Sequence, residues 1–112
     1  MDVIWTPEAI DRLEDIHYYL KIKQKAPIAA QEMVRRLVSR VPQISDMPLS
    51  GRQVADYDNP SVREVIESSY RIIYQVADNA IYILSIMHCR QRLPNYKAMK
   101  AAANDVIEGI NR

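Results

Sequence analysis

The side chains of this chain that could do chemistry are arginines and one histidine between residues 52 and 92. A guanidinium group binds carboxylate or phosphate through paired hydrogen bonds, and it cannot accept a proton as a general base. Such a group favours a surface that binds an acidic peptide or a phosphate backbone. Each arginine could instead cap a loop, pair with Glu64, Glu67 or Asp56, or lie on a solvated face. The five arginines concerned are Arg52, Arg63, Arg71, Arg90 and Arg92.

Arg71 is the strongest candidate, because it is the one charge inside the otherwise apolar segment YRIIYQV at residues 70–76. Strand alternation places Arg71 on the face opposite to Tyr70 and Tyr74. A buried charge without a partner costs too much free energy to be retained. Arg71 is therefore predicted to have an acidic partner or to lie on an open polar face.

His88 follows the last apolar segment and could act as an acid or a base, on the same face as Arg90 if the strand continues. Without a placed partner it is an ordinary hydrogen-bonded histidine at a strand end. Cys89 would point to the other face and is interpreted as a small buried hydrophobe. One cysteine and two histidines fall short of a structural zinc site, and no metal or cofactor is expected.

The first third of the chain predicts a strand followed by a helical hairpin. Residues 2–5 are mostly apolar and β-branched, and Thr6 and Pro7 supply an N-cap and a first-turn proline. Apolar residues then recur every three or four positions, which is the pattern of an amphipathic helix. Pro27 can start a second helix with the same periodicity.

Two prolines bear on the end of the second helix. Pro42 lacks a backbone N–H, so a kink or an early end is expected there, and the helix is expected to be gone by Pro48. Residues 47–61 hold most of the turn-forming residues, which predicts a long ordered loop.

Three segments rich in Val, Ile and Tyr follow at residues 62–67, 70–76 and 80–87, and they predict an antiparallel meander. The alanine-rich residues 95–112 predict a C-terminal helix. The expected fold is therefore α+β, with an N-terminal helical hairpin packed on a small antiparallel sheet in the order β-α-α-β-β-β. Residues 1–94 form the predicted domain, and residues 95–112 form a helical tail.

Length and charge restrict the function further. The chain has 112 residues, the size of one domain, and 15 basic against 14 acidic residues give a net charge of +1. Bulk charge therefore gives no reason to expect direct nucleic-acid binding. No apolar run is long enough to span a bilayer, and a cytoplasmic protein is expected.

The order of these segments resembles the RelE/ParE superfamily of toxins from bacterial type II toxin–antitoxin systems, and it looks closest to the ParE branch. The likeness covers residues 3 to about 93, and each segment alone is weak. The matching segments are IWTPEAIDRLEDIHYYL, PLSGR, VRE, YRIIYQV and IYILSIMHCRQR.

This resemblance implies two helices on a small antiparallel sheet whose first strand is residues 3–5. It also implies a cognate protein antitoxin that folds onto the toxin and alone contacts operator DNA. ParE-like toxins are associated with inhibition of DNA gyrase, whereas RelE-like toxins cleave messenger RNA on the ribosome. Arg71 matches an arginine of both branches, and Arg52, Arg63, His88 and Arg90 match recurrent ParE-like positions.

The lysines typical of the RelE branch are absent, because no lysine lies between residues 26 and 96. The leading hypothesis is thus a non-enzymatic gyrase inhibitor that an antitoxin neutralises. The alternative is a RelE-like endoribonuclease with His88, Arg71 and Arg90 acting on the scissile phosphate. A third possibility is a degenerate toxin retained as a binding module that co-represses its own operon.

Overall fold

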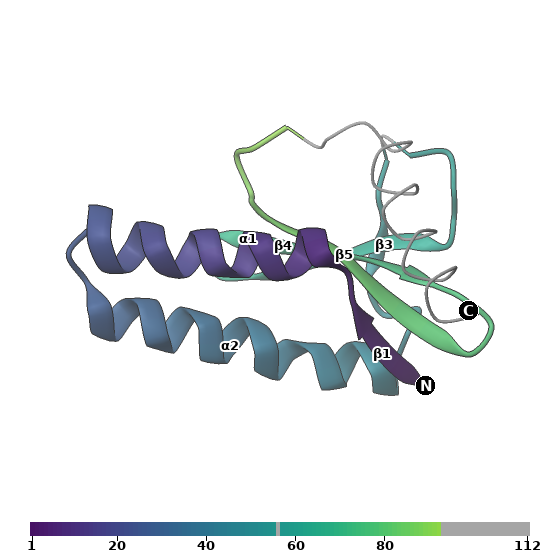
Figure 1. Cartoon of the computed structure of the whole chain (residues 1–112). Helices are drawn as coiled ribbons and strands as arrows, with labels where there is room; N and C mark the ends of the chain where they lie inside the picture. The colour runs from purple at the N-terminus through teal and green to yellow at the C-terminus, as the bar shows by residue number, and fades with distance from the viewer. Residues whose placement is uncertain (56, 93–112) are drawn as a thin grey trace.

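A computed structural model describes residues 1–55 and 57–92 of the chain. A helical hairpin forms one layer, and it lies along one face of a sheet (Figure 1). The predicted α+β class is therefore confirmed. The predicted C-terminal helix and the boundary at residue 94 lie outside the described residues. Along the chain the elements are β1 (Asp2–Trp5), α1 (Pro7–Tyr18), η1 (Tyr19–Lys23), α2 (Pro27–Asp46), β2 (Arg52–Gln53), β3 (Val62–Glu67), β4 (Tyr70–Val76) and β5 (Ala80–His88).

The start of α1 is fixed by Thr6, as the sequence predicts. The Thr6 side chain accepts a hydrogen bond from the Ala9 amide at 3.2 Å, and Pro7 fills the first turn. The same hydroxyl is buried and lies 2.7 Å from the Ile83 carbonyl oxygen, to which it can donate. This one side chain therefore both caps α1 and ties it to β5.

The hairpin turn contains a widened helical segment. After α1 the chain continues as the π-helix η1, and Lys25 then takes a left-handed conformation with φ 52°. Such π-helical turns are rare and occur often at functional sites.

Helix α2 runs through Pro42 to Asp46 without a break. The early end considered for Pro42 is therefore wrong, whereas the prediction that the helix is gone by Pro48 is confirmed. Leu37, Val41 and Ile44 of this helix are buried on the sheet. Their packing on both sides of Pro42 offsets the loss of one backbone hydrogen bond.

The sheet has five strands in the order β1-β5-β4-β3-β2. Strands β3, β4 and β5 form the predicted antiparallel meander. Two details differ from the sequence-based expectation. Strand β1 pairs with β5 in parallel, so the sheet is mixed, and the loop at 47–61 contributes the two-residue strand β2. Strand β1 is followed by the hairpin rather than by a tight turn, and a parallel pair needs such a long crossover.

A bulge in β5 changes which side chains face the helices. Ile73 pairs with Ser85 and Tyr74 with Ile83, which leaves Leu84 as an extra residue. Ile83 lies in the core beneath the helices, and beyond the bulge Ile86 takes up that position. The strict alternation assumed from the sequence therefore does not hold through this strand.

Both faces of the sheet carry buried side chains. Tyr70, Ile72 and Tyr74 pack beneath the helices, and Ile73 lies in a second cluster on the opposite face, so the alternation predicted for β4 is confirmed. Val54 and Tyr57 from the loop at 47–61 belong to this second cluster. The loop is therefore packed on the sheet. No helix in the described residues is long and apolar enough to cross a membrane.

Candidate functional site

The arginine cluster consists of Arg52 on β2, Glu64 on β3 and Arg71 on β4, with Glu64 at its centre. Glu64 is 5% exposed, and one of its carboxylate oxygens lies 2.6 Å from Nε of Arg52. The other oxygen lies 3.4 Å from a terminal nitrogen of Arg71. Two guanidinium groups thus share one buried carboxylate. Of the two environments predicted for Arg71, an acidic partner or an open polar face, the structure shows the acidic partner.

Strand register explains why these three residues meet. Arg52 on β2 lies directly opposite Glu64 on β3. Arg71 on β4 lies opposite Ile66, which points to the same face of β3 as Glu64 because the two are two residues apart. Glu64 and Arg71 are therefore diagonal neighbours, a spacing that long side chains can bridge.

Arg71 has a second contact that fixes the chain after β5. Its side chain is 12% exposed, and the other terminal nitrogen donates to the Gln91 carbonyl oxygen at 2.8 Å. The Gln91 side chain in turn accepts a hydrogen bond from the His88 amide at 2.9 Å. Arg71 therefore links the buried Glu64 to the turn that carries His88 and Arg90.

Arg63 contacts the loop before β2 and forms no ion pair with an acid among the described residues. One terminal nitrogen donates to the Gly51 carbonyl oxygen at 2.8 Å and lies 3.3 Å from that of Leu49. Tyr74 clamps the same loop, because its hydroxyl donates to Pro48 and accepts from the Gly51 amide. Burial raises the pKa of the Tyr74 phenol.

Gly51 is required by this close packing. A Cβ atom at this position would overlap the Tyr74 hydroxyl and lie 2.8 Å from the Glu64 carbonyl oxygen. The PLSGR segment therefore serves to pack the loop against the strands that hold the arginine cluster.

His88 is the last residue of β5 and is partly exposed. Its ring meets Tyr70 edge to face, with centroids 5.5 Å apart. The Nδ1 atom accepts a hydrogen bond from the Arg90 amide at 3.1 Å, so the neutral ring carries its proton on Nε2. Burial raises the pKa of the neighbouring Tyr70 phenol. The described residues place no carboxylate in an ion pair with this histidine.

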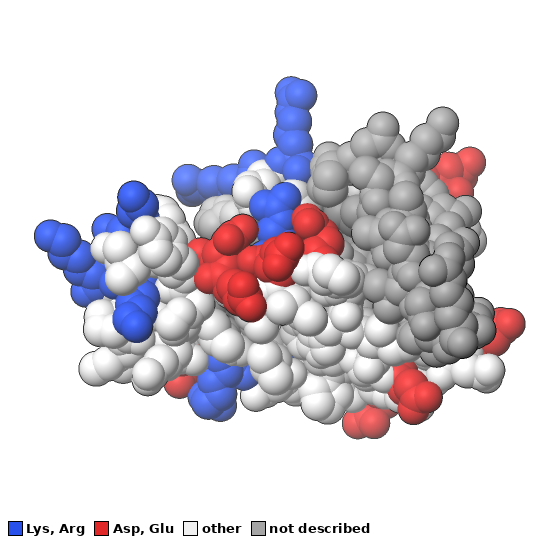
Figure 2. All heavy atoms as spheres, in the orientation of Figure 1, with Lys and Arg blue, Asp and Glu red and all other residues white. Residues whose placement is uncertain are grey.

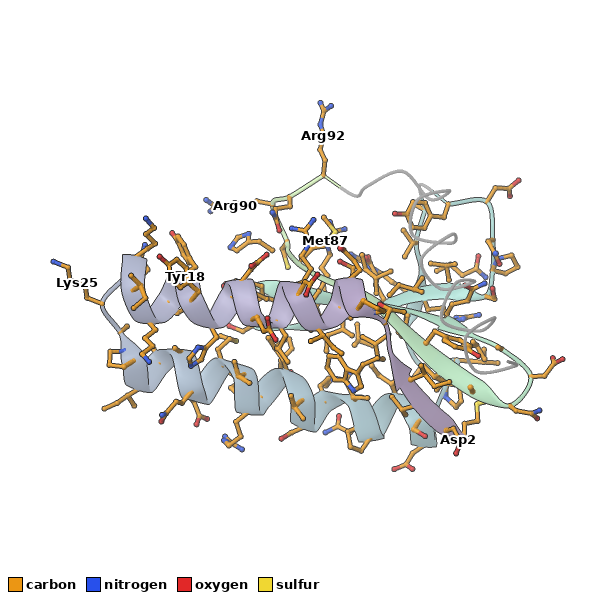
Figure 3. The ribbon with its side chains drawn as sticks, viewed as in Figure 1. Asp2, Tyr18, Lys25, Met87, Arg90 and Arg92 are labelled. Carbon is orange, nitrogen blue, oxygen red and sulfur yellow. The ribbon has the colours of Figure 1, made fainter. Side chains whose placement is uncertain are left out.

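The chain leaves the sheet after His88, which changes two expectations. Arg90 lies in the following turn, so strand alternation does not relate it to His88. Cys89 is exposed, and its interpretation as a buried hydrophobe is wrong. Arg90 and Arg92 are also exposed; Arg92 extends outward from the chain after β5, and Arg90 is directed toward the turn end of the hairpin (Figure 3). Neither forms an ion pair within the described part of the chain.

The structure thus brings Arg52 and Arg71 together through Glu64, whereas Arg90 and Arg92 have no acidic partner among residues 1–55 and 57–92. The sequence pattern offers Glu64 only as one of several acids that could pair with an arginine, and it gives no sign that Gln91 contacts Arg71. Glu64 could have been found from alternation, because it lies between Val62 and Ile66 on one face of a strand. No cluster of three or more potential metal ligands occurs among the residues described.

Comparisons with known proteins agree with this architecture. The "Toxin RelE2" of Caulobacter vibrioides is 36% identical over 87 residues, which are 77% of this chain and 92% of that protein. Y4kP of Sinorhizobium fredii, named as a candidate toxin, is 33% identical over 92 residues, or 80% of this chain and 90% of its own. A structure described as "Chromosomal ParDE TA system from P. aeruginosa" has a similar fold, with a TM-score of 0.64 and 24% identity. The match covers 79% of this chain and 95% of the chain in that structure.

A family model described as "ParE toxin of type II toxin-antitoxin system, parDE" matches residues 3–93. The matched range contains both helices, strands β2 to β5, all of β1 except its first residue, and every arginine of the cluster. The chain therefore belongs to the ParE toxin family of type II toxin–antitoxin systems.

Proposed function

We propose that this toxin inhibits DNA gyrase and is neutralised by a cognate protein antitoxin. The observation that carries the proposal is the match to the ParE toxin family over residues 3–93, together with the chemistry of the site within that range. The site is composed mainly of arginines, which bind anions and do not accept protons.

The contacts that these side chains already make favour binding of a partner over cleavage of a phosphodiester. Acid–base cleavage needs a proton acceptor within hydrogen-bond reach of the attacking group. Arg52 and Arg71 already share Glu64, and Nδ1 of His88 is occupied by the Arg90 amide. The one ring atom left to exchange a proton with a substrate is Nε2 of His88.

An endoribonuclease of the RelE kind is the second candidate, and two observations favour it. The Caulobacter vibrioides relative carries the name RelE2. Nε2 of His88 is uncommitted, and the exposed Arg90 is two residues away. These two side chains could act on a phosphate together with Arg71.

An antitoxin is proposed to bind across the helical hairpin and the sheet edge. Several large apolar side chains of the hairpin are exposed, among them Ile28 at 81% and Tyr18 at 57%. The exposed Arg90 and Arg92 could pair with carboxylates of a segment that folds on binding. In this proposal DNA is contacted only through the antitoxin, and the complex is a hetero-oligomer.

Induced expression in a bacterial host separates the two candidate activities. We expect a DNA-damage response with bulk messenger RNA intact, because trapped gyrase breaks DNA. Rapid loss of messenger RNA without that response would replace the proposal by the ribonuclease.

Hydrogen exchange with and without the antitoxin tests the proposed contact. Protection is expected on α1, α2 and β1. Protection confined to residues 95–112 would reject this binding mode.

A further inference from the structure

Strand β5 extends beyond its neighbour β1 and leaves part of one edge uncovered. Strand β1 ends at Trp5, which lies opposite Ile83, whereas β5 continues to His88. At the end of β5 the Cys89 amide donates to the Ser69 carbonyl oxygen, on the side of β4, at 2.8 Å. Because successive amides along a strand point to opposite sides, the His88 amide points to the edge that β1 does not cover.

Gln91 binds both backbone groups of His88. The Gln91 side-chain oxygen accepts a hydrogen bond from the His88 amide at 2.9 Å. The Gln91 amide donates to the His88 carbonyl oxygen at 3.0 Å, which closes a four-residue turn over residues 88–91. This one glutamine therefore satisfies the uncovered edge at His88 and restrains the peptide groups on both sides of it.

Two further hydrogen bonds hold the same turn. Nδ1 of His88 accepts from the Arg90 amide at 3.1 Å, which fixes the imidazole ring against the turn. Arg71 donates to the Gln91 carbonyl oxygen at 2.8 Å and is itself paired with the buried Glu64. Gln91 is thus the residue through which the turn is attached to the buried cluster.

The turn borders a pocket of about 760 Å³ whose other lining residues come mostly from α1, η1 and α2. His88 and Gln91 line this pocket, and its two charged lining residues are Arg12 and Asp15. Arg12 is paired with Glu8 at 2.9 Å, whereas Asp15 is exposed and forms no ion pair within the described part of the chain. An arginine released from the turn could therefore pair with Asp15.

The arginines of the turn are held apart from the acidic side chains of α1. In Figure 2 basic side chains project from the upper outline of the molecule, and acidic side chains gather in the middle of the same face. Figure 3 has the same orientation and places Arg90 and Arg92 in this upper region, on the chain after β5. The exposed acids of α1 are Asp11, Glu14 and Asp15. The conformation of the turn thus keeps both guanidinium groups accessible to a partner.

We infer that Gln91 is a positioning residue, which fixes the ring of His88 and the direction of Arg90 through its bonds to both backbone groups of His88. A side chain that is already held in place loses less conformational freedom on binding, so it binds a partner more tightly. That Arg90 contacts gyrase rests on the proposed function. The positioning of the ring and the turn does not depend on it.

Three variants separate the side-chain bond of Gln91 from its other contacts. Gln91→Met removes the side-chain acceptor and keeps a side chain of similar length, whereas Gln91→Glu keeps an acceptor. Gln31→Met is the matched control, because Gln31 is exposed on α2 and does not line the pocket. Gln91 is exposed as well, so all three variants should melt within about 4 °C of wild type.

Nitrogen–proton correlation spectra of the imidazole rings read out the positioning directly. The chain has two histidines, and His17 on α1 is the internal reference. At about pH 8, where an ordinary imidazole is neutral, wild-type His88 should carry its proton on Nε2. Gln91→Met should give a mixture of both neutral tautomers, and Gln91→Glu and Gln31→Met should match wild type. An unchanged His88 ring spectrum in Gln91→Met would overturn the inference.

Amide hydrogen exchange locates the effect within the turn. In Gln91→Met the His88 amide loses its acceptor and should exchange about tenfold faster or more. The Cys89 amide bonds to the Ser69 carbonyl oxygen and should exchange as in wild type. Equal acceleration of both amides would show fraying of the whole strand end and would contradict a specific role of Gln91.

Gyrase supercoiling measures the functional consequence. Gln91→Met should need about three- to tenfold more toxin for equal inhibition, because the loss of one hydrogen bond has that size, and Gln31→Met should act as wild type. Inhibition by wild type and an equal inhibition by Gln91→Met would overturn the role of Gln91 and leave the proposed function standing. No inhibition by wild type would reject the proposed function, and the ring and exchange spectra would then decide on the positioning alone.

Discussion

Two groups of arginines differ in this protein although the residue type is the same. Arg52 and Arg71 share the buried Glu64, and Arg71 is also tied to the backbone of Gln91. Arg90 and Arg92 are exposed and form no ion pair within the described residues. One buried acid therefore separates arginines that hold the structure from arginines that are available to a partner.

The difference shows where substitutions should change stability and where they should change binding. The Glu64 cluster lies between β2, β3 and β4 and reaches the turn after β5. A change in this cluster is expected to lower the free energy of unfolding. A change at Arg90 or Arg92 is expected to leave folding intact and to alter partner affinity.

Removal of Glu64 should have the largest effect on stability. Glu64→Ala leaves Arg71 with a mostly buried charge and no acidic partner, and loss of one member of a buried pair costs about 3 to 5 kcal/mol. Urea denaturation measures the change in the free energy of unfolding. Glu32→Ala is the control, because Glu32 forms a fully exposed pair with Arg35, and it should leave this free energy nearly unchanged. Equal losses of stability in the two variants would contradict a stabilising role for the buried Glu64 cluster.

Gly51→Ala should cause the next largest loss of stability. The added methyl group overlaps the Tyr74 hydroxyl and lies close to the Glu64 carbonyl oxygen, and such overpacking costs about 1 to 3 kcal/mol. Thermal denaturation measures the loss. In a Tyr74→Phe background the methyl group no longer meets the hydroxyl, so the cost of Gly51→Ala should fall. Strictly additive costs would show that the loop moves to avoid the overlap.

Arg71→Lys tests the comparison between the two groups of arginines. A lysine cannot reach Glu64 and the Gln91 carbonyl with separate nitrogens, so a loss of roughly 1 to 3 kcal/mol is expected. Arg90→Lys should stay within about 0.5 kcal/mol of wild type, as most exposed substitutions do. Chemical denaturation of both variants under one set of conditions gives the answer. Similar losses of stability in both variants would show that the two groups of arginines do not differ in their effect on folding.

The smallest expected change in stability occurs at high pH. Burial raises the pKa of Tyr70 and Tyr74 above the ordinary value of 10.0, so the folded chain holds these phenolic protons more tightly than the unfolded chain. Their contribution to stability is full below about pH 10 and is lost as the pH rises further. Denaturation between pH 8 and 11 should show this decrease, and Tyr74→Phe should make it shallower. No decrease above pH 10 would contradict the burial effect.

Much of the fold follows from sequence patterns. Thr6, Pro7 and Pro27 mark the helix starts, and alternation in residues 70–76 predicts which face of β4 meets the helices. The bulge at Leu84 and the parallel pairing of β1 depend on long-range register, which local periodicity does not contain.

The site was predictable in part. The place of Arg71 in an apolar strand predicts either an acidic partner or an open polar face, and Glu64 is the acidic partner. The link from Arg71 to Gln91 and the exposure of Cys89 could not be foreseen, because both depend on the chain leaving the sheet after His88. The pocket also joins segments that are far apart in the sequence.

The measurement that tests the proposed function most directly is supercoiling by purified DNA gyrase with the antitoxin-free toxin. The account predicts slowed supercoiling or trapped cleaved DNA with wild-type protein. It also predicts a reduced effect with a folded Arg90→Gln/Arg92→Gln variant, whose exposed charges are lost. Unchanged gyrase activity at excess toxin, together with cleavage of messenger RNA on programmed ribosomes, would contradict it.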